Sequence, residues 1–89
     1  MAKPTKKRIT FKLHAPKAKT VFVAGTFNDW DAQARTLKPD SKGNWSTWTS
    51  LIPGTYEYRF IIDGQWHEDP QCEDRCPNPH GTYNSVIHL

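Results

Sequence analysis

The chain of 89 residues has no apolar run approaching the roughly 18 residues that a membrane-spanning helix needs. Its basic start, residues 1–8, is followed at 9–13 by alternating apolar and polar residues, and not by the apolar segment of a secretory signal. We therefore expect a cytoplasmic protein with no membrane partner.

Catalytic motifs are also missing. The chain has no G-x-S-x-G nucleophile elbow and no glycine-rich phosphate loop. Nearly all of its nine acidic residues stand in turn-forming segments, whereas glycoside hydrolysis needs two carboxylates fixed across a rigid cleft. A single domain of this length is also too small for a cleft between two lobes. We predict a binding module without catalytic residues.

Cysteine is scarce, because only Cys72 and Cys76 are present. A cytosolic location favours reduced thiols, and a disulfide between these two would close only a short loop and add modest stability. Together with His67 and His80 they supply enough side chains for a zinc site, but their spacing matches no usual zinc pattern. We expect neither a metal nor another cofactor.

Acidic residues are absent before Asp29, while seven of the twelve Lys and Arg residues lie between positions 3 and 19. One interpretation is that the basic arm at residues 1–8 contacts nucleic acid, because Lys and Arg side chains neutralise the charge of phosphate groups. The alternative is a flexible, solvated arm beside an edge strand that lysines protect from aggregation. We favour the second interpretation and expect no nucleic-acid partner.

No segment shows the roughly 3.6-residue apolar period of a helix, and no internal repeat is evident. Short segments of alternating or continuous apolar character, separated by turn residues, are instead typical of strands. The predicted strands are residues 9–13, 21–24, 36–38, 44–51, 55–62, 65–67 and 82–89, with Asp63-Gly64 as a two-residue hairpin turn. Residues 21–24 are apolar throughout, as in a central strand buried on both faces, and residues 68–81 are expected to be irregular. The pattern predicts an all-β antiparallel sandwich over residues 9–89.

The four tryptophans can belong either to the core or to a binding surface. Trp45 is in phase with Leu51 and is assigned to the core, while Trp48 falls on the opposite face, as a secondary contact or as a lid on basic side chains. Trp30 and Trp66 each stand at the end of a strand, beside a polar turn. An indole there can fold back on the core or stack on a flat apolar ligand such as the C–H face of a sugar ring.

Polar groups near these rings would be needed to bind sugar hydroxyls. Arg59 alternates with the apolar residues of the 55–62 strand, so its side chain points away from the core and is free to reach a ligand.

Five stretches of the chain resemble a known family. In this order, residues 21–30, 43–45, 53–66, 69–70 and 78–86 are similar to family-48 carbohydrate-binding modules. These include the glycogen-binding domain of the AMP-activated protein kinase β subunit and the early-set domain found before starch branching and debranching enzymes. The short length and the 77–79 loop look most like free-standing bacterial versions. The resemblance implies an immunoglobulin-like sandwich with no catalytic site, which binds α-1,4-linked glucan.

The resemblance also implies roles for particular residues. Trp30 and Trp66 would cradle the glucan, Arg59 would replace the lysine of the kinase module, and Thr82 and Asn84 would bind hydroxyls. His80 stands where the kinase module has a leucine that passes through the curve of the glucan, and Tyr83 replaces a small aliphatic residue.

Glucan binding, to glycogen, starch, amylose or cyclodextrin, is therefore the function that we predict. The alternative is a spacer or interaction sandwich that docks to a glucan-metabolising enzyme or a kinase and does not bind sugar itself, because fold alone does not determine function.

Overall fold

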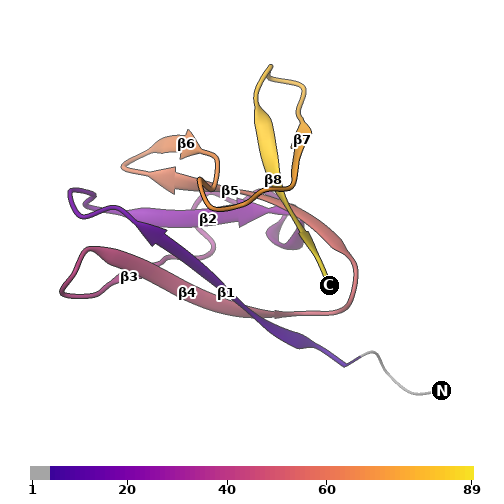
Figure 1. The fold of residues 1–89 in the computed structure, drawn as a ribbon, viewed down its shortest axis with the longest axis horizontal. Coiled ribbons are helices and arrows are strands. Elements are labelled where there is room, and N and C mark those ends of the chain that lie inside the picture. The colour runs from indigo at the N-terminus through magenta and orange to yellow at the C-terminus, as the bar shows by residue number, and fades with distance from the viewer. Residues whose placement is uncertain (1–4) are drawn as a thin grey trace.

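The computed structural model describes residues 5–89, which form two antiparallel β-sheets packed as a sandwich (Figure 1). The elements are β1 (Lys7–His14), β2 (Val21–Gly25), η1 (Thr26–Asn28, a short 3-10 helix), β3 (Lys38–Pro39), β4 (Asn44–Leu51), β5 (Thr55–Ile62), β6 (Gln65–His67), β7 (Arg75–Pro77) and β8 (Tyr83–His88). The first sheet has the order β1-β4-β3, and the second has the order β2-β5-β8-β7 with β6 paired to β5. The predicted antiparallel, immunoglobulin-like sandwich is confirmed. None of the described residues belongs to a helix with the length and hydrophobicity that a bilayer crossing requires.

Strand β5 organises the second sheet, because three strands pair with it. β2 pairs with residues 58–62 on one edge. The other edge is shared, since β8 pairs with residues 55–58 and β6 pairs with residues 60–62. Arg59 is the position at which the partner on this edge changes. Two hairpins, β5–β6 and β7–β8, therefore meet beside Arg59 on the same edge of one strand.

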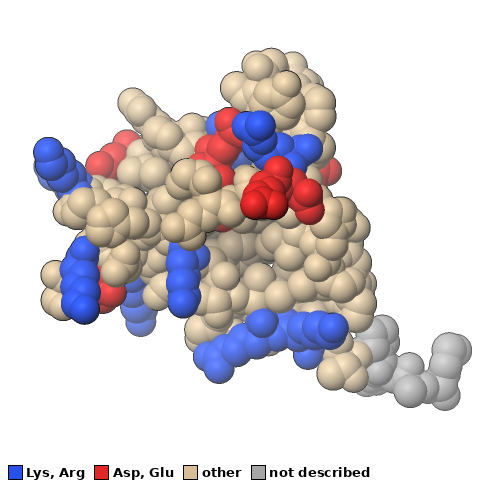
Figure 2. Space-filling model, viewed as in Figure 1, with Lys and Arg blue, Asp and Glu red and all other residues tan. Residues whose placement is uncertain are grey.

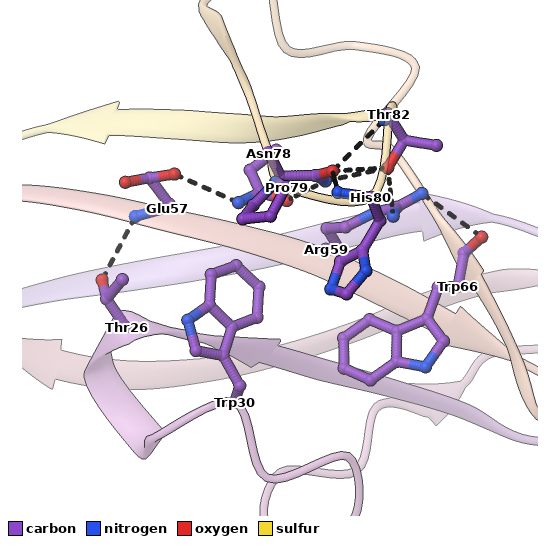
Figure 3. A pocket seen from close by; sticks show the side chains of 10 residues that line it. Thr26, Trp30, Glu57, Arg59, Trp66, Asn78, Pro79, His80 and Thr82 are labelled. Carbon is purple, nitrogen blue, oxygen red and sulfur yellow. Dashed lines mark hydrogen bonds between the residues drawn. The ribbon is translucent and has the colours of Figure 1, made fainter.

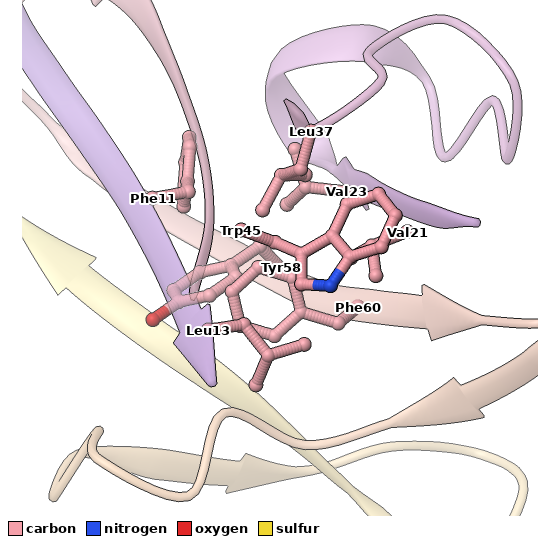
Figure 4. Packing of buried hydrophobic residues seen from close by; sticks show 8 residues of the cluster. All are labelled: Phe11, Leu13, Val21, Val23, Leu37, Trp45, Tyr58 and Phe60. Atoms are coloured by element: carbon pink, nitrogen blue, oxygen red, sulfur yellow. The ribbon is translucent and has the colours of Figure 1, made fainter. Parts of the chain in front are cut away.

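The core lies between the sheets and follows the predicted alternation (Figure 4). Its buried cluster consists of Phe11, Leu13, Val21, Val23, Leu37, Trp45, Tyr58 and Phe60. Phe60 has no exposed surface, and burial of a side chain of this size stabilises the fold by about 1.5–3 kcal/mol. Trp45 packs here as predicted, and its indole N–H donates to the carbonyl of Ala15 at 2.9 Å.

Trp48 lies on the outer face of the first sheet, as the alternation of β4 predicts. Its side chain is 51% exposed, and the Arg8 guanidinium carbon lies 4.0 Å from the centroid of its ring. The tryptophan thus supports a basic side chain by a cation–π contact.

Two segments differ from the sequence prediction. β2 is well buried along its length, but it ends the strand order of its sheet and is not central. Its outer edge is covered by residues 35–37, because Val23 N donates to Arg35 O at 3.0 Å and Leu37 N donates to Val21 O at 2.9 Å. The segment 68–81, expected to be irregular, contains β7. A three-residue strand that ends in proline carries too little alternation to be found without its partner β8.

The N-terminal boundary of the sandwich also differs from the prediction. β1 begins at Lys7, so the last two residues of the predicted arm at 1–8 belong to a strand. Residues 1–4 of that arm lie outside the described residues.

Candidate functional site

A groove lies on the outer face of the second sheet, where the two hairpins meet beside β5 (Figure 3). Its volume is about 760 Å³. Its walls come from the segment after β2, from β5 and β6, and from the β7–β8 hairpin. The lining residues are Thr26, Trp30, Glu57, Arg59, Trp66, Asn78, Pro79, His80, Thr82 and Asn84. Because these segments are distant in sequence, the groove exists only in the folded chain.

Trp30 and Trp66 form the apolar surface of the groove. Their ring centroids are 6.4 Å apart and their planes are inclined by 47°. Trp66 is 42% exposed and Trp30 is half-buried. At this inclination the rings do not stack on each other, so each can present a face to a ligand. The pair is a bent apolar platform.

The turn after β2 aims Trp30 at the groove. Asn28 fixes the start of this turn, because its Oδ1 accepts the N–H of Gly25 at 3.0 Å and its Nδ2 donates to the carbonyl of Val23 at 3.3 Å. Asp29 and Trp30 then have φ angles of 54° and 58°. This left-handed conformation costs a residue with a side chain about 1–2 kcal/mol. Strain of this kind is found where the surrounding structure holds a residue for function.

The β5–β6 hairpin places Trp66 on the same face as Arg59. Its two turn residues, Asp63 and Gly64, have φ angles of 49° and 85°, as a two-residue hairpin turn requires, so the predicted turn is confirmed. Trp66 pairs with Ile61, and Ile61 shares a strand face with Arg59 because the two are two residues apart.

Arg59 links the two hairpins. Its Nη1 donates to Thr82 Oγ1 at 3.0 Å, and its Nη2 donates to the carbonyl of Trp66 at 3.4 Å. Its Nε is buried without a partner, the single side-chain nitrogen or oxygen in that condition among residues 5–89. A guanidinium has five N–H donors in a fixed plane, so the hydrogens that remain can reach the oxygens of a ligand.

Asn78 organises the turn between β7 and β8. Its Oδ1 accepts the backbone N–H of His80 at 3.0 Å and that of Thr82 at 3.2 Å. Its Nδ2 lies 2.8 Å from Thr82 Oγ1 and 2.9 Å from Asn84 Oδ1, and it donates to both. One side chain therefore fixes three neighbours that line the groove.

Glu57 lies in the groove two residues before Arg59 on β5. Its Oε1 accepts the thiol hydrogen of Cys76 at 2.7 Å and an amide hydrogen of Asn84 at 3.1 Å. These hydrogen bonds, that of the thiol first, hold the pKa of Glu57 below its usual range. The hydrogen bond to Glu57, and then burial, raise the pKa of the Cys76 thiol. At neutral pH the carboxylate is therefore ionised and the thiol is its protonated donor.

Residues 7–89 match the protein family described as the glycogen recognition site of AMP-activated protein kinase. The chain belongs to this family. The family is a class of carbohydrate-binding module, a kind of domain that is not itself catalytic, and membership supports glucan recognition in general.

Similar proteins include the 5'-AMP-activated protein kinase subunit beta-2 of Rattus norvegicus and that of Homo sapiens, each 34% identical over 88 residues. The alignments cover 98% of this chain but only 31% of each subunit, so the chain spans about a third of their length. The protein named PTST homolog 2, chloroplastic, of Arabidopsis thaliana is 43% identical over 53 residues, which are 60% of this chain and 10% of that protein.

Every residue that the sequence predicted for sugar contact lines this groove. They are Trp30, Arg59, Trp66, His80, Thr82 and Asn84. Their contact with glucan stays a prediction. Asn84 differs from the others because it is only 7% exposed and both ends of its amide already bind protein groups, Glu57 and Asn78. It retains one N–H and one lone pair for a ligand.

Sequence reasoning missed four residues that also line the groove: Thr26, Glu57, Asn78 and Pro79. Glu57 carried a usable signal, because it has the same alternation phase as Arg59. Asn78 carried a weaker one, because an asparagine between two prolines is typical of a turn that its side chain stabilises. Nothing in the sequence distinguishes Thr26.

Tyr83 lies outside the groove. It alternates with Asn84 on β8, so its ring is on the other face of that strand, where the Arg75 guanidinium carbon lies 5.3 Å from the ring centroid.

Both cysteines are free thiols with different partners. Cys72 Sγ donates to the carbonyls of Asp74 and Val86, at 3.3 and 3.4 Å, whereas Cys76 binds Glu57. Within residues 5–89 no group of three His, Cys, Asp or Glu side chains is arranged to hold a metal ion.

Proposed function

We propose that the chain binds α-1,4-linked glucan in this groove without chemically changing it. The observation that carries the proposal is the tilted pair of Trp30 and Trp66, with the fixed guanidinium of Arg59 on the same face. An α-1,4-linked glucan is curved, so successive sugar rings do not share a plane. Two indoles inclined by 47° to each other therefore fit a curved glucan better than a glucan whose sugar rings lie in one plane.

Polar residues around the platform supply hydrogen bonds to the hydroxyls. Arg59 donates through the Nη hydrogens that Thr82 and Trp66 do not use, and Asn84 offers the free N–H and lone pair of its amide. The Thr82 hydroxyl accepts from Arg59 and Asn78 and donates to Asn78, so a sugar hydroxyl bound there would replace one of these bonds. His80 is exposed at the rim, where its ring can contact the outer edge of the ligand. The affinity is modest, because each sugar hydroxyl exchanges a bond to water for a bond to protein.

Isothermal titration with β-cyclodextrin tests this function. Trp30→Ala and Trp66→Ala are each expected to weaken binding by about 10-fold or more, since each removes the burial of an aromatic ring against the sugar. Trp48→Ala is the matched control, because Trp48 is also exposed but lies on the other sheet. If the wild-type chain binds no β-cyclodextrin at millimolar concentration, the proposal is wrong.

Docking to a larger assembly is a second candidate function. One observation favours it: the region that matches this chain makes up 31% of the length of the relatives named as kinase subunits, so in those proteins it is joined to further sequence. A glucan-metabolising enzyme or a kinase would then be the partner. If this is the whole function, mixing the partner with the chain gives a complex whose affinity Trp30→Ala leaves unchanged, and β-cyclodextrin does not bind.

A further inference from the structure

Only one of the two oxygens of the Glu57 carboxylate is hydrogen-bonded to other described residues of the protein. Both hydrogen bonds that it accepts, from Cys76 and from Asn84, end on Oε1. Oε2 has no hydrogen-bond partner among residues 5–89, and it is not among the buried atoms that lack one. This oxygen is therefore not fully buried, and it belongs to a residue that lines the groove.

The position of Glu57 gives the groove two unlike ends. Glu57 and Thr26 lie beside Trp30, while Arg59 lies beside Trp66 (Figure 3). An ionised carboxylate only accepts hydrogen bonds and a guanidinium only donates them. A ligand that spans both indoles therefore meets an acceptor at the Trp30 end and donors at the Trp66 end.

The backbone holds Glu57 in this place. Its N–H donates to Thr26 Oγ1 at 3.2 Å, which ties β5 to the segment that carries Trp30. The hydrogen bonds on Oε1 restrict rotation of the carboxylate, so a ligand contact to Oε2 costs little further side-chain freedom.

We infer that Glu57 is a further sugar-binding residue, whose Oε2 accepts hydroxyl hydrogens of a glucan unit stacked on Trp30, and that it makes the groove selective for uncharged glucan. The inference rests on the proposed glucan-binding function. A hydrogen bond from a hydroxyl to a carboxylate is about twice as strong as one between neutral groups. A phosphate or sulfate on the same unit would instead be repelled by the carboxylate.

The charged and titratable groups around Glu57 are few. Arg59 follows it on β5, Cys76 faces it from β7, and His80 lines the groove from the turn. Farther along β8, His88 lies 3.3 Å from Asp74. The groove-lining residues of the segment after β2 and of the start of β8 are Thr26, Trp30 and Asn84, and none of them carries an acidic or basic group. Glu57 is the one carboxylate among the described residues that line the groove.

Glu57→Gln separates ligand contact from a purely structural role. Glutamine keeps an oxygen for Cys76 and Asn84 but replaces the free acceptor Oε2 by an N–H₂ donor. Glu73→Gln makes the same chemical change at an exposed position outside the groove and is the control. We expect Glu57→Gln to weaken β-cyclodextrin binding about 10-fold at pH 7, with Glu73→Gln unchanged.

The pH profile and a charged ligand complete the experiment, with thermal unfolding at each pH to confirm that the variants are folded. Wild-type binding of neutral β-cyclodextrin should weaken as pH falls below the usual glutamate range, and Glu57→Gln should be flat there. The preference for β-cyclodextrin over its derivative sulfated at every 6-position should be smaller in Glu57→Gln than in wild type.

The outcomes distinguish this inference from the proposed function. If wild type binds β-cyclodextrin and Glu57→Gln has the same affinity, acid profile and preference, then Glu57 is not a sugar-binding residue and the glucan function stands. If wild type does not bind, the proposed function is wrong and the inference is lost with it.

Discussion

Nη1 of Arg59 lies 3.0 Å from the hydroxyl oxygen of Thr82, and this bond ties β5 to the turn before β8. The same guanidinium reaches the carbonyl of Trp66 on β6. Both hairpins that border the groove are thus fixed by one planar group, at the position where β5 changes its partner.

Arg59→Lys is expected to weaken β-cyclodextrin binding about 5- to 10-fold. Lysine keeps the charge, but its ammonium cannot bond to Thr82 and Trp66 at once in the planar arrangement of a guanidinium and also donate to a ligand. Calorimetric titration measures the effect. Arg35→Lys, at an exposed position outside the groove, should bind as wild type does. Equal affinities for Arg59→Lys and wild type would show that only the charge at this position matters.

Tyr58→Phe is expected to lower the free energy of unfolding by about 1–3 kcal/mol, because a half-buried carboxylate loses its donor. The Tyr58 hydroxyl donates to Asp69 Oδ2 at 2.6 Å, and Asp69 N donates in turn to the buried Ser85 at 3.1 Å. Urea unfolding of the variant gives the value. Tyr83→Phe, which alters an exposed ring, is the control and should change little.

The same bond predicts an alkaline limit to stability. Burial first, and then the bond to Asp69, raise the pKa of Tyr58 above the value of about 10 for a free tyrosine. Because the folded-state pKa is the higher one, the stabilisation is complete below about pH 10 and declines as pH rises above it. Tyrosinate absorbance should therefore show Tyr58 ionising together with unfolding. Ionisation of all three tyrosines while the chain remains folded would contradict this.

Gly25→Ala should destabilise the fold by about 1–3 kcal/mol through overpacking. Gly25 has an extended backbone, so the cause is space and not strain. A Cβ there would collide with the carbonyl oxygen of Glu57 and lie 2.6 Å from Phe27 Cε1. Gly54→Ala is the matched control, because its nearest contact would be an ordinary 3.8 Å from Tyr56. Thermal unfolding should show a clear loss for the first variant and almost none for the second.

Cys76 variants test how the groove keeps its carboxylate ionised. The pKa of Glu57 is lowered mainly by the Cys76 thiol, so its charge persists in acid until pH falls through that lowered value. In Cys76→Ala the pKa should rise toward the usual range, and the charge should be lost at higher pH. Cys76→Ser, which restores a donor, should behave like wild type.

NMR titration of the Glu57 carboxyl carbon follows this shift directly. Cys72→Ala is the control, because Cys72 donates to backbone carbonyls and does not touch Glu57. The same pKa in Cys76→Ala and wild type would show that Asn84 alone stabilises the carboxylate.

The sequence predicted the sandwich because most strands alternate cleanly. In β4 the pattern separates buried Trp45 from exposed Trp48, and in β5 it turns Arg59 away from the core. The β5–β6 hairpin could also be predicted from the sequence, because Asp63-Gly64 has a strong preference for a two-residue hairpin turn. The six predicted groove residues come from these clear elements and from the family resemblance.

Features that depend on contacts between distant segments could not be predicted. β7 owes its existence to pairing with β8, and the burial of β2 at the end of its sheet depends on residues 35–37. The bonds that join Glu57 to Cys76 and Asn84 connect residues 19 and 27 positions apart. No local pattern encodes such pairs.

The groove takes its walls from the segment after β2, from the β5–β6 hairpin and from the β7–β8 hairpin, which are brought together only by folding. An unfolded chain therefore offers no binding site, and any ligand of the groove must shift the folding equilibrium by mass action. At a ligand concentration 100 times the Kd this adds about 2.7 kcal/mol to the free energy of unfolding. The core of an 89-residue sandwich is small, so this contribution is a large one. A polysaccharide bound in the groove would reversibly stabilise the fold by holding three separate segments of the chain together.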